Sequence, residues 1–142
     1  MKRRLFIAGN WKLNKTAAET AETVADLKAK LADFNGSLDV ALFPPFLSIA
    51  AGQAAAAGSP IGIGAQNVHF AESGAYTGEL SAAMLKEAGI ELVIIGHSER
   101  RQYFGETNET VNLRTKASLA AGIKPFVCIG ETLEEREGGN ME

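Results

Sequence analysis

Hydrophobic and polar positions along the chain alternate between two patterns. Short apolar runs with β-branched residues, each closed by a turn signal, predict buried strands, and between them apolar residues recur at helical spacing. The runs that predict strands are Arg4–Gly9, Leu38–Phe43, Ile61–Ala65, Leu92–Ile95 and Lys124–Ile129. The segments that predict helices are Thr16–Phe34, Leu47–Ala57, Glu79–Ala88 and about Thr107–Ala121. The resulting order βαβαβαβαβ predicts a parallel α/β sheet with right-handed crossovers.

This alternation leaves two architectures open, a doubly wound open sheet and part of a (β/α)8 barrel. No G-x-G-x-x-G follows a predicted strand and G-x-x-x-x-G-K-[ST] is absent, which disfavours dinucleotide-binding and P-loop folds. No linker or low-complexity segment divides the chain, so we expect residues 1–142 to belong to a single domain. The predicted loop over residues 66–78 is longer than the usual connection and is a candidate for function.

Composition narrows the class of protein. A hydrophobic content of 46% with 22% charged residues is typical of a soluble globular domain. The net charge of −3, with no basic face, gives no support to binding of nucleic acid or of an anionic membrane. The first apolar stretch stops at Asn10, too early for a signal peptide or a membrane span. The one cysteine, Cys128, fits a reducing cytoplasm, and we interpret it as a packed thiol because no base lies near it in sequence.

The strand at Leu92–Ile95 is followed at once by polar residues. Active sites of parallel α/β folds lie at the carboxyl ends of strands, which makes His97 a candidate. Ser98, Glu99 and Arg100 look like the start of a helical turn, whose dipole would keep the imidazole neutral and able to donate a hydrogen bond. By its position alone, however, His97 is more often a satisfied polar residue than a catalytic one.

The end of the first predicted strand carries a second candidate pair. If the strand continued to Lys12, then Asn10 and Lys12 would project to the same face. A lysine inside a barrel mouth needs an anion or a carboxylate as a partner, and an anionic substrate would supply one. The alternative is that Lys12 begins a solvated loop, which is the commoner place for a lysine.

Four blocks of sequence carry a resemblance to a known family. AGNWKLN at residues 8–14, GAQNVHFAESGAYTGELSAAML at 64–85, IIGHSERRQYFGETNE at 94–109 and CIGETLEERE at 128–137 together closely resemble the triosephosphate isomerase family. Their common order makes the set far more specific than any one block. The resemblance implies a (β/α)8 TIM barrel, of which residues 1–142 would form the amino-terminal portion.

The resemblance also implies roles for particular residues. Lys12 would bind the phosphorylated triose and help polarise its carbonyl, and Asn10 would position the substrate. His97 would be the neutral electrophile that moves a proton between the two enediolate oxygens. Glu99 would pair with Lys12, and its role would be either to organise the site or to take part in proton transfer. The implied reaction, part of glycolysis and gluconeogenesis in the cytoplasm, interconverts dihydroxyacetone phosphate and D-glyceraldehyde 3-phosphate with no metal and no organic cofactor.

In the family the long loop reaches into a neighbouring subunit, so a homodimer is expected. Thr77 would then contact the neighbour's site near Asn10 and Glu99, and Glu79 would pair with the neighbour's Arg100. The residues themselves fit equally well a solvated excursion that contacts no partner.

The length of the chain adds a further expectation. A complete barrel needs about 250 residues, whereas this sequence has 142. The family's last three strands, catalytic glutamate, lid and glycine-rich phosphate loops have no counterpart here, so we expect the isolated chain to be inactive. We also expect open sheet edges at the first and fifth strands, with exposed apolar side chains and a tendency to aggregate. Two alternatives are a non-catalytic half barrel that complements a separate carboxyl-terminal chain, and a small phosphate-binding protein of different activity.

Overall fold

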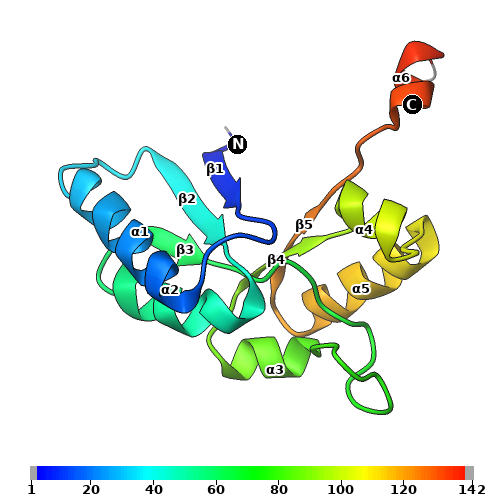
Figure 1. The fold of residues 1–142 in the computed structure, drawn as a ribbon, viewed down its shortest axis with the longest axis horizontal. Helices are drawn as coiled ribbons and strands as arrows, with labels where there is room; N and C mark the ends of the chain where they lie inside the picture. The colour runs from blue at the N-terminus through cyan, green and yellow to red at the C-terminus, as the bar shows by residue number, and fades with distance from the viewer. Residues whose placement is uncertain (1–2, 140–142) are drawn as a thin grey trace.

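The computed structural model describes residues 3–139 as five parallel strands alternating with helices (Figure 1). The strands are, in chain order, β1 Leu5–Asn10, β2 Leu38–Phe43, β3 Ile61–Ile63, β4 Leu92–Ile95 and β5 Lys124–Val127. The helices are α1 Ala17–Lys30, the single 3-10 turn Phe46–Ser48, α2 Ile49–Ala56, α3 Ala82–Glu87, α4 Ser98–Tyr103, α5 Asn108–Ala120 and α6 Leu133–Glu137. The predicted α/β class and the parallel sheet are confirmed.

The five strands form two parallel groups, β1-β2-β3 and β4-β5, in which neighbours in space are also neighbours in the sequence. β1 pairs with β2 from Leu5–Leu38 to Asn10–Phe43, β2 pairs with β3, and β4 pairs with β5. A bridge between Ala65 and Val93 connects the two groups, because the Ala65 amide donates to the Leu92 carbonyl at 2.9 Å. The carboxyl ends of all five strands therefore lie along one side of the same parallel arrangement.

Several predicted boundaries were wrong. The helix expected over Thr16–Phe34 ends at Lys30, and the strand expected to reach Ile129 ends at Val127. The helix expected from Glu79 begins only at Ala82, because Ser81 is its N-cap and accepts a hydrogen bond from the Met84 amide.

Other local predictions hold. Thr16 and Glu19 form the expected capping box at the start of α1, and α4 is the helical turn expected after His97. The helix α6 was not predicted, although Thr132 and Glu135 form a capping box of the same kind at its start. This signal was present in the sequence.

The core has two parts. The larger cluster lies between the strands and the helices and includes Val24, Ile63 and Val93. The smaller cluster lies on the opposite face of the strands, where Phe43 packs with Ala41 and Ile94. Helices α1 and α2 pack together over the first three strands, and α5 packs against β4 and β5 (Figure 1).

The two edges of the sheet are open, as expected. In the described residues β1 and β5 each pair with one strand only, and Leu5 is 71% and Ile7 58% exposed. The inner face is less exposed than expected, because the Phe6 and Phe126 rings pack 4.8 Å apart across the interior. Exposed apolar side chains lie on the outer face of β1 and after β5, and also elsewhere in the chain, at Leu13, Leu47 and Phe104.

Candidate active site

A groove of about 640 Å³ lies at the carboxyl ends of the strands. It is lined by residues that follow β1, β3 and β4, among them Asn10, Lys12, Gln66, His97 and Glu99. The sequence-based candidates Asn10, Lys12, His97 and Glu99 thus meet in one place, although they come from segments far apart in the chain.

Lys12 does not continue the first strand, the conformation that was considered for it from the sequence alone. The strand β1 ends at Asn10, and Lys12 has a left-handed backbone with φ of 53°. The idea that strand alternation brings Asn10 and Lys12 to one face is therefore wrong. Instead the Asn10 side-chain oxygen accepts a hydrogen bond from the Lys12 amide at 2.9 Å, which is the local turn that asparagine favours.

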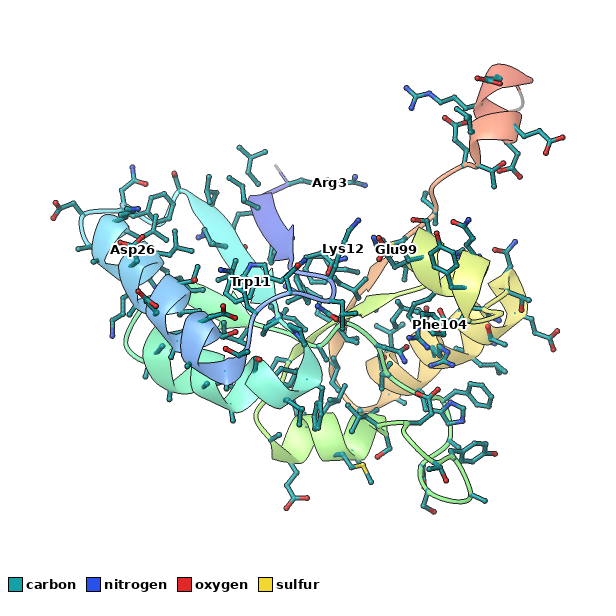
Figure 2. The ribbon with its side chains drawn as sticks, in the orientation of Figure 1. Arg3, Trp11, Lys12, Asp26, Glu99 and Phe104 are labelled. Carbon is teal, nitrogen blue, oxygen red and sulfur yellow. The ribbon has the colours of Figure 1, made fainter. Side chains whose placement is uncertain are left out.

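The side chains of Lys12 and Glu99 point toward each other (Figure 2). Lys12 Nζ lies 2.7 Å from Glu99 Oε1, and the two side chains are 51% and 41% exposed. The hydrogen bond from the Lys12 ammonium lowers the pKa of the Glu99 carboxyl below its ordinary value, so Glu99 is an anion at neutral pH. The groove therefore contains the Lys12 ammonium group, and the carboxylate paired with it, that of Glu99, is accessible to water.

His97 is the N-cap of α4. Its Nδ1 accepts a hydrogen bond from the Glu99 amide at 3.2 Å. A nitrogen that accepts an N–H carries no proton, so the ring proton lies on Nε2. The Glu99 carboxylate is also 3.5 Å from Nδ1, but this longer contact does not replace the amide hydrogen bond. The geometry therefore presents His97 as a donor through Nε2, the arrangement expected for a neutral electrophile.

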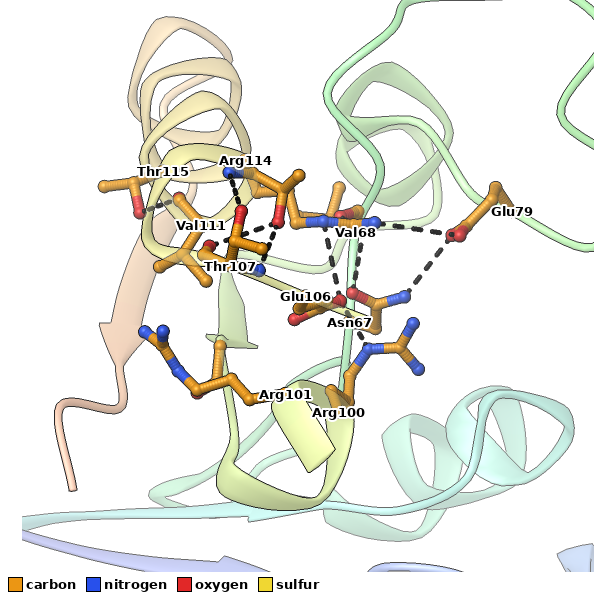
Figure 3. A network of polar contacts seen from close by, with 12 residues as sticks. Asn67, Val68, Glu79, Arg100, Arg101, Glu106, Thr107, Val111, Arg114 and Thr115 are labelled. Atoms are coloured by element: carbon orange, nitrogen blue, oxygen red, sulfur yellow. Dashed lines mark hydrogen bonds and ion pairs between the residues drawn. The ribbon is translucent and has the colours of Figure 1, made fainter. Parts of the chain in front are cut away.

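Beside the groove lies a buried charge network that the sequence did not reveal (Figure 3). Glu106, whose side chain is 2% exposed, accepts a hydrogen bond from Arg100 Nε at 2.6 Å. Arg114 Nε lies 3.5 Å from the same Glu106 oxygen. Arg114 also donates to the side-chain oxygen of Asn67 at 3.0 Å and to the Val68 carbonyl. This network joins the start of the long loop to α4 and α5.

Two of the three predicted interface residues, Glu79 and Arg100, have partners within the chain. Glu79 lies 3.8 Å from Arg114 and accepts a hydrogen bond from the side-chain Nδ2 of Asn67 at 3.3 Å. Arg100 is paired with Glu106. Thr77 is exposed in the long loop and does not line the groove of the described chain. A role of Thr77, Glu79 or Arg100 between subunits stays a prediction.

Two further polar side chains follow strands, and of these Gln66 lines the groove whereas Cys128 packs against the smaller core cluster. Gln66 follows β3 and donates to backbone carbonyls of two other segments. It was missed, although it follows a predicted strand just as His97 does. Cys128 is partly buried, and burial raises the pKa of its thiol, which agrees with a packed rather than a nucleophilic cysteine.

Within residues 3–139, no group of three or more His, Cys, Asp or Glu side chains is placed to hold a metal ion. In the same range no helix has both the length and the apolar character that crossing a membrane requires.

Comparisons with known proteins agree on one family. The family model described as "Triosephosphate isomerase" matches residues 5–142. The chain is 51% identical over 140 residues to a triosephosphate isomerase of Gloeothece citriformis, a match that covers 99% of this chain and 58% of that protein. It is 53% identical over 137 residues to a triosephosphate isomerase of Carboxydothermus hydrogenoformans, covering 96% of this chain and 54% of that protein. The chain spans about half the length of the curated relatives it matches.

Proposed function

Because the chain belongs to the triosephosphate isomerase family, we propose that residues 1–142 provide the substrate-binding and electrophilic part of a triosephosphate isomerase site. The observation that carries this proposal is the meeting of Lys12, His97 and Glu99 in one groove. The proposed reaction interconverts dihydroxyacetone phosphate and D-glyceraldehyde 3-phosphate, as a step of glycolysis and gluconeogenesis in the cytoplasm.

The reaction begins when a base removes a proton from the carbon beside the carbonyl group. The electrons of the broken C–H bond form a C=C bond, and the carbonyl oxygen gains the charge of an enediolate. His97 donates from Nε2 to the enediolate oxygens and moves a proton from one to the other. Return of a proton to the neighbouring carbon gives the isomeric triose phosphate. Only protons are transferred between groups, and the triose is neither oxidised nor reduced overall, so the chemistry requires no metal and no organic cofactor.

The other groove residues bind and orient the substrate. The Lys12 ammonium attracts the phosphate and helps polarise the carbonyl, which is the electrostatic help that a developing oxyanion needs. Asn10 uses its oxygen to hold Lys12, so its side-chain N–H groups can donate to the substrate. Glu99 holds both Lys12 and the Nδ1 side of His97, and we assign it an organising role.

We further propose that the 142-residue polypeptide by itself turns over negligibly. None of its glutamates matches the family position of the carbon base, and a general base typically contributes a factor of about 10² to 10⁴. The exposed outer face of β1 and the exposed Ile129, 89% accessible, favour a second role in which the chain is completed by further barrel strands. A homodimer formed through the long loop is part of the same proposal.

The first experiment compares two samples in an isomerase assay, with the intact mass measured on each. One is the 142-residue polypeptide, and the other is a fusion of residues 1–142 to the part of the Gloeothece citriformis relative that follows the matched stretch. We expect activity only in the fusion. Turnover by the mass-verified 142-residue chain at the level of the fusion would contradict the proposed division of the site.

In the fusion, His97→Gln replaces the imidazole by an amide, which can still donate a hydrogen bond but cannot pass a proton from one enediolate oxygen to the other. We expect kcat to fall by a factor of about 10² to 10⁴ with a smaller change of KM. Gln102→Ala, at an exposed position on the same helix α4, serves as the control. Equal kcat values in the two variants would remove His97 from the mechanism.

A further inference from the structure

The side-chain amide of Gln66 joins two strand ends to the turn that carries Lys12. Its Nε2 donates to the Lys12 carbonyl at 2.8 Å and to the Phe43 carbonyl at 2.8 Å. Phe43 is the last residue of β2, and its carbonyl also accepts the Trp11 amide at 3.1 Å. One amide group that follows β3 therefore fixes the turn after β1 to the end of β2.

The backbone of Lys12 requires such support. A non-glycine residue with φ of 53° is in a sparsely populated conformation, which persists only when its surroundings hold it there. Asn10 holds the amide of Lys12, and Gln66 holds its carbonyl. The two peptide groups that flank the Lys12 side chain are thus both fixed by side-chain amides.

This conformation sets where the Lys12 side chain starts. The stem of a lysine is flexible, so the backbone must direct it into the groove if its ammonium is to be found there often. In the left-handed conformation Lys12 Nζ reaches Glu99 Oε1 at 2.7 Å. Relaxation to an ordinary conformation would turn the stem away from this direction.

We propose that Gln66 is a positioning residue that holds Lys12 in its left-handed conformation and thereby sets the affinity of the groove for a phosphorylated substrate. The inference rests on the proposed function, and it requires no contact between Gln66 and the substrate. Gln66 acts through two carbonyl groups of its own chain, so its removal affects binding through Lys12.

The test variant is Gln66→Met, which keeps the length of the side chain and removes both N–H donors. The matched control is Gln53→Met, because Gln53 Nε2 also donates to a backbone carbonyl, that of Ala88 at 2.9 Å, away from the groove. In the fusion of residues 1–142 to the remainder of the relative, we expect Gln66→Met to raise KM for dihydroxyacetone phosphate about tenfold or more, since small misplacements cost up to about 10². We expect kcat to change less than KM, and Gln53→Met to change neither.

A second measurement reports on the backbone itself and does not need activity. The ¹³Cα chemical shift of Lys12 depends on φ and ψ, and we expect it to move in Gln66→Met but not in Gln53→Met. If the fusion is inactive, the proposed function fails while this shift still decides the role of Gln66. Gln66→Asn, which keeps an amide but is one methylene shorter, replaces Gln66→Met if the latter does not fold. Unchanged KM together with an unchanged Lys12 shift in the folded variant would overturn the proposal.

Discussion

Two ion pairs made by consecutive residues of α4, Glu99 and Arg100, have almost the same length and very different surroundings. Lys12 and Glu99 lie 2.7 Å apart with both side chains about half exposed. Arg100 and Glu106 lie 2.6 Å apart, and the Glu106 side chain is 2% exposed. Exposed pairs contribute little to stability, whereas breaking a buried pair leaves an uncompensated charge. A substrate can therefore separate Lys12 from Glu99, whereas the Arg100–Glu106 pair stabilises the fold beside the groove.

The largest effect is expected from removal of the buried Glu106 carboxylate. Glu106→Ala leaves Arg100 and Arg114 without their shared partner, and Arg114 is itself 6% exposed. We expect a loss of about 3–5 kcal/mol in the free energy of unfolding, or loss of the cooperative transition, measured by urea denaturation. Glu22→Ala, at an exposed position of α1, is the control. A change in Glu106→Ala no larger than in the control would show that the network does not stabilise the fold.

The exposed pair is tested by Lys12→Met. We expect the urea midpoint to stay within error of the parent, because water replaces the lysine as a partner of Glu99. In the fusion the same variant should raise KM for dihydroxyacetone phosphate, since the cation of the groove is lost. Lys30→Met removes a comparable exposed pair with Asp26 at 2.8 Å and should leave KM unchanged. A large drop in stability in Lys12→Met alone would erase the distinction between the two pairs.

The smallest effect is expected for the pH dependence of stability that Glu99 contributes. The pKa of Glu99 is lowered in the folded chain from its ordinary 4.5 by the hydrogen bond from Lys12. A lowered folded pKa means a contribution that is present above pH 4.5 and lost as the pH falls through the folded value. Glu99→Gln should therefore make stability slightly less dependent on pH below 4.5. Identical pH profiles of the variant and the parent would show that the pairing with Lys12 does not persist in solution.

The sequence predicted the elements of this fold better than the contacts between them. Alternating apolar runs and helical spacing identified all five strands, because burial on both faces leaves a local pattern. The start of α3 was missed because the Ser81 cap competes with helical propensity over Glu79. The spacing of apolar residues does not show whether the helix begins at Glu79 or after Ser81.

The candidate site, too, was predicted only in part from the sequence. His97 was found because it directly follows a buried strand, and Glu99 because of the family blocks around it. The left-handed backbone of Lys12 was not foreseen, since one of the two side chains that hold it, Gln66, is distant in sequence. Arg114 and Glu106 were missed for a similar reason: nothing in a helix pattern distinguishes a buried arginine from a solvated one.

The order of the strands has a consequence for how the polypeptide is assembled during synthesis. In the described range β2 and β3 each pair with the strand before them, β5 pairs with β4, and an isolated bridge from Ala65 to Val93 connects the segment after β3 to β4. Contacts between neighbouring βα units close short loops, which lowers the entropic cost of each step and favours rapid folding. As the ribosome releases the chain, each new unit can dock on a surface that already exists. Translation and folding can thus proceed in the same direction, one unit at a time.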